Sequence, residues 1–135
     1  MRRFTLLSVA LLTLAACGGS DPTGPEDTIP GRYNLVSLNG TALPFVLIQI
    51  LEDKIEVTAG DLQLNSDGTC SSSLTTRETL DGVVTTETQT GLCSWTLNNT
   101  AIAFVWTEDG DTDSGSLIDG RVTVTSDGLV LVFEK

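Results

Sequence analysis

Cys17 is the residue of this chain whose position points most directly to a chemical modification. It follows two alanines at the end of an apolar run that starts at Phe4, directly after a pair of arginines. A basic start, a short apolar stretch and small residues before a cleavage point are the layout of a secretory signal. The run is shorter than the roughly 20 residues that a membrane-spanning helix needs. We therefore expect residues 1–16 to be a signal peptide.

The four residues Leu14-Ala15-Ala16-Cys17 resemble the lipobox of bacterial lipoproteins. In that family the cysteine sulfur receives a diacylglyceryl group, the preceding peptide is removed and the new amino group is acylated. The resemblance implies palmitate-type lipidation of Cys17 and a membrane anchor, to which each buried CH₂ contributes about 0.8 kcal/mol. Because Gly18 rather than aspartate follows the cysteine, it also implies the outer membrane of a bacterial cell envelope rather than the inner membrane.

The other two cysteines, Cys70 and Cys93, form an even pair in a chain that we expect to be exported, where disulfides persist. Their positions also suggest a bond. If Asp81-Gly82 is a two-residue hairpin loop, Leu80 faces Val83, and counting outward along both strands brings Cys70 opposite Cys93. A disulfide needs about 4.4–6.8 Å between its Cα atoms, which such a pair satisfies. The sequence therefore predicts a cross-strand disulfide.

Side chains that carry catalytic or metal chemistry are scarce. The chain has no histidine, the commonest general base and transition-metal ligand. Nothing in the sequence would activate a serine as a nucleophile. Asp109, Asp111 and Asp113 have the alternating spacing of a calcium loop, but Ser114 and Gly120 stand where an EF-hand needs glycine and glutamate. We expect no enzyme, no bound metal and no cofactor.

The charge balance is strongly acidic. Loss of residues 1–16 would remove two arginines and no acid, so the net charge of −11 would become −13. Such a surface is repelled by phosphates, and we expect no nucleic-acid partner. Residues 17–30 are rich in Gly, Pro and acidic side chains with almost nothing apolar. They predict a flexible linker that begins with the lipidated cysteine and precedes a single domain, residues 31–135.

From Gly31 onward, short β-prone runs alternate with turn signals. Six Asx-Gly steps favour tight hairpin turns, namely Asn39-Gly40, Asp67-Gly68, Asp81-Gly82, Asp109-Gly110, Asp119-Gly120 and Asp127-Gly128. No segment has helical periodicity. About eight to ten sequential strands predict an all-β fold, a small antiparallel up-and-down barrel whose closure removes the free sheet edges. A β-sandwich is the alternative. The polar stretch from Thr75 to Thr90 indicates a hairpin that projects into solvent.

Several segments resemble bacterial lipocalin-like domains, which have a calycin-type barrel. They are Gly31-Arg32-Tyr33-Asn34-Leu35, Leu43-Pro44, Asn65-Ser66-Asp67-Gly68-Thr69, Gly91-Leu92-Cys93-Ser94-Trp95 and the closing Gly128-Leu129-Val130-Leu131-Val132-Phe133. The resemblance implies a barrel that binds a small hydrophobic ligand, with Tyr33, Trp95, Phe104 and Trp106 as candidate ligand-binding residues. Tyr33 stands where lipocalins have tryptophan, and the domain is short.

Apolar residues that alternate along the strands predict the barrel interior. They are Tyr33, Leu35, Leu64, Leu74, Trp95, Leu97, Ile102, Phe104, Trp106, Val122, Val124, Leu131 and Phe133. Such a stripe can line a ligand cavity or simply fill the barrel. The sequence thus leaves two functions open: an envelope lipoprotein that carries a small apolar ligand, which the resemblance favours slightly, or a structural and interaction lipoprotein with a filled barrel. A cavity of about 300 Å³ or more inside the barrel would indicate the first function rather than the second.

Overall fold

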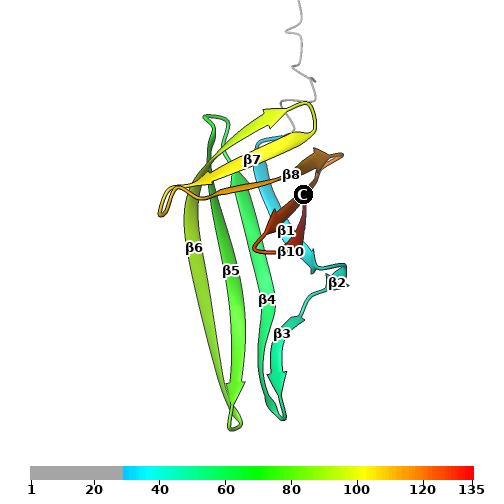
Figure 1. Cartoon of the computed structure of the whole chain (residues 1–135), viewed down its shortest axis with the longest axis vertical. Helices are drawn as coiled ribbons and strands as arrows, with labels where there is room; N and C mark the ends of the chain where they lie inside the picture. Colours follow the sequence, from blue (N-terminus) through cyan, green and yellow to red (C-terminus); the bar gives the residue numbers. More distant parts are fainter. Residues whose placement is uncertain (1–28) are drawn as a thin grey trace, which may run out of the picture.

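The computed structural model describes residues 29–135, which form an all-β domain without a helix (Figure 1). Ten strands belong to one antiparallel sheet. In chain order they are β1 (Gly31–Leu38), β2 (Thr41–Ala42), β3 (Phe45–Ile50), β4 (Asp53–Leu64), β5 (Thr69–Leu80), β6 (Val83–Asn98), β7 (Ala101–Trp106), β8 (Thr112–Ile118), β9 (Arg121–Ser126) and β10 (Leu129–Glu134). The predicted all-β class is confirmed.

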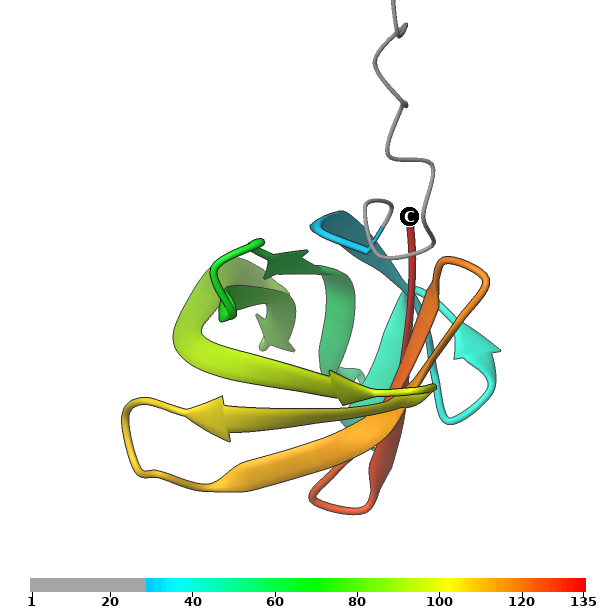
Figure 2. The ribbon, with the colours of Figure 1, turned by 90° about the horizontal axis from the view of Figure 1, so that it is seen from above.

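The sheet closes into a barrel because β1 pairs with two strands at once, β10 and β4. Strands β4 to β10 are neighbours in sequence order, so β1 completes an up-and-down ring of eight strands (Figure 2). The short strands β2 and β3 lie outside this ring, beside β1 and β4. The barrel, and not the alternative sandwich, is the fold. Since all ring strands lie within residues 31–134, a chain that begins at Gly18 retains the complete barrel.

Three ring strands are much longer than the others, and their excess length projects beyond the barrel (Figure 1). β1 pairs with β4 only over Asp61–Leu64, and β7 pairs with β6 only from Cys93 onward. Beyond these points β4, β5 and β6 continue together with β3 as a four-stranded sheet, which we call the extension. The projecting stretch from Thr75 to Thr90 is therefore flanked by β3 and β4 rather than standing alone.

Four of the six Asx-Gly steps form the predicted turns with positive φ at both residues. They are Asn39-Gly40, Asp81-Gly82, Asp119-Gly120 and Asp127-Gly128. At Asp67 and Asp109 only the following glycine has positive φ. There the carboxylate accepts a backbone N–H two residues ahead, from Thr69 and Asp111 respectively, at 2.9 Å. This Asx-turn geometry builds longer loops than a two-residue hairpin.

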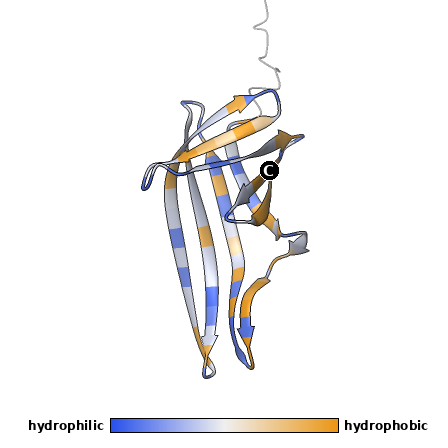
Figure 3. Ribbon diagram, viewed as in Figure 1, coloured by the Kyte–Doolittle hydropathy of each residue, from blue (hydrophilic) through white to orange (hydrophobic). Residues whose placement is uncertain are grey.

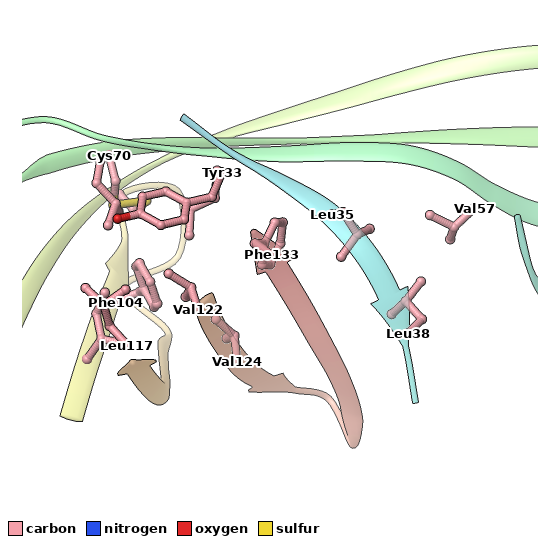
Figure 4. Close-up of a cluster of buried hydrophobic side chains, with 14 residues drawn as sticks. Tyr33, Leu35, Leu38, Val57, Cys70, Phe104, Leu117, Val122, Val124 and Phe133 are labelled. Atoms are coloured by element: carbon pink, nitrogen blue, oxygen red, sulfur yellow. A yellow bond between two sulfur atoms is a disulfide. The ribbon is translucent and has the colours of Figure 1, made fainter. Parts of the chain in front are cut away.

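The hydrophobic core fills the barrel (Figure 4). All the residues predicted for the interior belong to it, either buried or packed against the buried set. The core also contains Leu38, Val57, Leu62, Leu117 and the two cysteines. Val57 and Leu38 lie at the end of the barrel from which the extension leaves, so the core continues a short way into the extension.

The predicted disulfide between Cys70 and Cys93 is present, with 4.8 Å between the Cα atoms. The register that predicted it is uninterrupted from Leu80 opposite Val83 to Cys70 opposite Cys93, with no bulge between. Cys93 is also the first residue of β6 that pairs with β7. On β6 the disulfide therefore lies where pairing with β7 ends, whereas on β5 Cys70 lies opposite Leu64, at the end of the barrel where β1 begins.

The predictions for the N-terminal region lie outside the described residues. These are the signal peptide at residues 1–16, the lipidation of Cys17 and all but the last two residues of the linker at 17–30. Within the described part of the chain, β1 begins at Gly31. No helix in residues 29–135 has the length and apolar character of a membrane span.

Candidate functional site

The end of the barrel at which the chain enters and leaves is closed by the protein's own residues. Tyr33 is fully buried there, and its hydroxyl donates a hydrogen bond of 2.5 Å to the carbonyl oxygen of Ile29. Burial raises the pKa of this phenol. The Lys135 ammonium lies 5.6 Å from the centre of the Tyr33 ring and donates to the carbonyl of Pro30 at 2.9 Å. Tyr33 thus packs as part of a closed end.

Trp95 lies at the same closed end. Its indole Nε1 donates to the carbonyl oxygen of Asn65 at 3.0 Å, in the turn between β4 and β5. Its backbone N–H donates to Gly68 in that turn, at 2.9 Å. Both bonds hold the turn over the barrel end, so Trp95 fastens a loop to the core.

Phe104 lies directly opposite Trp95 on the neighbouring strand, and Trp106 lies two residues further along β7, opposite Cys93. Their rings stack with 6.3 Å between centres and 21° between planes. The Trp106 indole N–H donates to the Asp113 carboxylate at 2.7 Å. A small pocket of about 90 Å³ opens beside them, lined mainly by Leu62, Phe104, Trp106, Val124, Leu131 and Phe133. Ligand pockets have roughly 300–1,000 Å³, so this one has room only for water or a very small molecule.

The four candidate ligand-binding residues are therefore not gathered around one site. Tyr33 and Trp95 close one end of the barrel, and of the four only Phe104 and Trp106 border the small pocket, although Phe104 is the cross-strand neighbour of Trp95. The carboxylates with calcium-loop spacing make different contacts. Asp113 accepts a hydrogen bond from the Trp106 indole N–H, whereas Asp109 accepts the backbone N–H of Asp111 within a turn. Within residues 29–135 no group of three or more metal-ligating side chains forms.

Outside the pocket beside Trp106, large apolar side chains are exposed on the extension. Strand pairing places Ile48 and Ile50 of β3, Ile55 of β4 and Leu80 of β5 on the face that continues the barrel interior, which we call the inner face. Val83 of β6, opposite Leu80, completes this apolar strip. In Figure 3 the hydrophobic colour is prominent along β3 and the adjoining end of β4. A hollow of about 220 Å³ lies here, lined by Ile48, Ile50, Asp53, Lys54, Ile55, Glu78 and Leu80.

The outer face of the extension carries an ion cluster that the sequence did not predict. Glu56 of β4 is the one buried charged residue in the described part of the chain. Arg77, directly opposite on β5, donates two hydrogen bonds to its Oε2, at 3.0 and 2.7 Å, and Lys54 donates to its Oε1 at 3.0 Å. Two hydrogen bonds from Arg77 and, as a smaller effect, one from Lys54 hold the pKa of Glu56 below its usual value. The cluster uses two of the chain's few basic side chains on the outer face.

No family model, curated protein or solved structure matches this chain. Its functional assignment accordingly rests on its own residues and their geometry.

Proposed function

We propose that this protein is a lipid-anchored protein of the bacterial cell envelope whose filled barrel is a scaffold that presents the extension to a partner. The likeness of Leu14–Cys17 to a lipobox supports the anchor, and Gly18 after the cysteine supports the outer membrane. One observation carries the interaction role. The pocket beside Trp106 is about 90 Å³, whereas large exposed apolar side chains gather on the extension.

Carriage of a small apolar ligand is the second candidate, favoured by the apolar lining of the pocket that Phe104 and Trp106 border. A ligand of fatty-acid size would require this pocket to expand several-fold. The hydrogen bond between Trp106 and Asp113 and the stacked ring of Phe104 would have to move for that expansion. The scaffold role requires no such rearrangement, and we therefore prefer it.

The anchor is tested in a bacterial host that expresses the full chain. Cys17→Ser should abolish labelling by palmitate and leave the signal peptide uncut, because the acylated sulfur is missing. A variant with Cys70→Ser and Cys93→Ser controls for labelling at other thiols and should still be labelled. Labelled and processed Cys17→Ser protein in the membrane fraction would overturn the anchor.

The scaffold role is tested with the unlipidated chain that begins at Gly18. We expect its tryptophan fluorescence to stay constant when fatty acids and other amphiphiles are added at micromolar concentration. A saturable change that disappears in a Trp106→Phe variant would show that the pocket opens and would favour the carrier. Trp95→Phe is the matched control, because Trp95 lies at the closed end of the barrel.

A further inference from the structure

We infer that the inner face of the extension binds a cationic amphipathic helix of a partner protein. The inference deepens the proposed scaffold function and rests on it. Its basis is the combination of an exposed apolar strip, unpaired carboxylates beside that strip, and the dimensions of the four-stranded sheet.

The apolar strip is exposed to an unusual degree for side chains on the continuation of a core. The exposed fraction is 54% for Ile48, 68% for Ile50 and 64% for Val83. Scattered apolar residues are normal on a protein surface, but a contiguous patch beside a hollow indicates an interaction site. Here Ile48, Ile50 and Leu80 border the same hollow.

Carboxylates flank the apolar strip on the same face. Strand pairing places Asp53, Glu78 and Glu87 on the inner face, and neither Glu78 nor Glu87 has an ion pair in the described part of the chain. The nearby bases are paired with another carboxylate, since Arg77 and Lys54 both bind Glu56, although Lys54 also lines the hollow. The inner face therefore combines apolar contact area with negative charge, which complements a helix with one apolar and one basic side.

The size of the face suits a helix. Four strands spaced about 4.8 Å apart span about 14 Å, and an α-helix with its side chains is about 10–12 Å across. The four strands lie side by side from Thr76 to Leu80, a length of about 14 Å at about 3.4 Å per residue. A helix of about nine residues covers this length.

Other occupants fit the charges less well. A second copy of this chain is equally acidic, and its bases Arg32, Lys54, Arg77 and Arg121 are in ion pairs with its own carboxylates. An anionic membrane surface would be repelled by Glu52, Asp53 and Asp81 at the tip. The tip also lies at the opposite end of the molecule from Gly31, beyond which the chain leads to Cys17 (Figure 1).

The experiment measures binding of synthetic peptides to the chain that begins at Gly18. The probe is a fluorescent 14-residue peptide of Leu and Lys arranged with helical periodicity. The comparison peptides are the same sequence with Glu in place of Lys, and a scrambled Leu and Lys sequence. We expect only the first peptide to bind, with an affinity that falls as salt is added, because charge contributes.

Matched variants locate the binding face. Glu78→Gln with Glu87→Gln should weaken binding about tenfold, as the loss of two exposed ion pairs predicts. Glu108→Gln with Asp119→Asn makes the same change of charge in exposed turns elsewhere and should leave binding unchanged. Ile48→Thr on the inner face should weaken binding about fivefold. Val84→Thr, at a similarly exposed position on the outer face, should not.

Three results would overturn the inference. One is binding that the inner-face variants leave unchanged. The second is saturable binding to phosphatidylcholine and phosphatidylglycerol vesicles that is lost in Ile48→Thr, which would make the tip a membrane contact. The third is a dimer in analytical ultracentrifugation that Ile48→Thr dissociates. None of these results bears on the scaffold role, because that role is tested by a separate experiment, in which fatty acids probe the pocket beside Trp106.

Discussion

At the residue scale, Glu56 illustrates how a single charge is placed by its neighbours. It lies buried in the middle of the extension, and both of its oxygens accept hydrogen bonds from basic side chains. The basic side chains are themselves partly exposed, so the cluster remains in contact with water. We expect it to order the outer face of the extension, while its contribution to stability depends on the ionised form of Glu56.

This dependence gives a pH prediction. The folded-state pKa of Glu56 lies below its unfolded value, so its contribution is fully present above about pH 4.3 and is lost as pH falls through the folded pKa. Glu56→Gln should therefore be less stable than the unsubstituted chain at pH 7, with a difference that shrinks toward pH 3. Urea unfolding at several pH values measures this.

Glu78→Gln is the control for Glu56→Gln, because Glu78 has no ion pair in the described residues. Its stability should follow that of the unsubstituted chain across the same pH range. The lowered pKa of Asp67, caused first by the hydrogen bond from the Thr69 side chain, acts in the same direction but is common to all three proteins. A difference at Glu56→Gln that persists undiminished at pH 3 would contradict the prediction.

At the scale of an element, the turn between β3 and β4 is unusual. Leu51 has φ +57°, in the left-handed region, and its side chain is 91% exposed. Asparagine and glycine adopt this conformation readily, whereas for leucine it costs roughly 1–2 kcal/mol. Nothing in the packing compensates for a leucine exposed to this degree. The turn thus places an apolar side chain at the far end of the extension, in a backbone conformation that lowers the stability of the folded protein.

Leu51→Asn should stabilise the folded protein by about 1 kcal/mol, because asparagine tolerates the left-handed conformation. Thermal or urea unfolding measures the change. Leu51→Ala, which removes the same exposed apolar atoms without gaining that tolerance, should change stability much less. If both substitutions changed the free energy of unfolding equally, the cause would be removal of the exposed apolar side chain and not relief of the backbone conformation.

At the scale of the whole molecule, the barrel and the extension differ in how firmly their backbone is held. In the barrel, Trp95 pairs with Phe104 of β7, donates its backbone N–H to Gly68 on its other side and packs against the core. In the extension β6 pairs only with β5, and its residues from Val83 to Thr90 are exposed. The disulfide between Cys70 and Cys93 joins β5 to β6 at the residue of β6 where pairing with β7 ends. Local opening of the extension should therefore not spread into the barrel.

Hydrogen exchange tests this division. Amides of β6 from Val83 to Gln89 should exchange by a local opening of lower free energy than amides from Trp95 to Leu97 of the same strand. Residue-resolved exchange measured by NMR, on the chain that begins at Gly18, separates the two sets. Equal protection along the whole of β6 would show that barrel and extension unfold as one unit.

Much of this fold follows from the sequence because its information is local. Asx-Gly turns fix where strands end, and alternating apolar residues fix which side faces the core. The two-residue loop at Asp81-Gly82 was sufficient to predict the partner of Cys70, because β5 and β6 are paired without a bulge. The sequence likewise contains the likeness to a lipobox at Cys17, which is read from neighbouring residues alone.

Only the tertiary structure determined the features that depend on β-bulges or on pairing between strands far apart in the chain. Without the bulge between Val57 and Ala59, counting back from Leu64 opposite Cys70 would place Glu56 opposite Glu78 and turn Thr58 inward. The bulge brings Arg77 opposite Glu56 and turns Val57 and Ile55 to the inner face. A shift of one residue exchanges the two faces of a strand. The residues around Thr58 give no local signal that predicts this bulge. The candidate binding face therefore exists only through this register, and closure of β1 on β4 decides how much of β4 remains to form it.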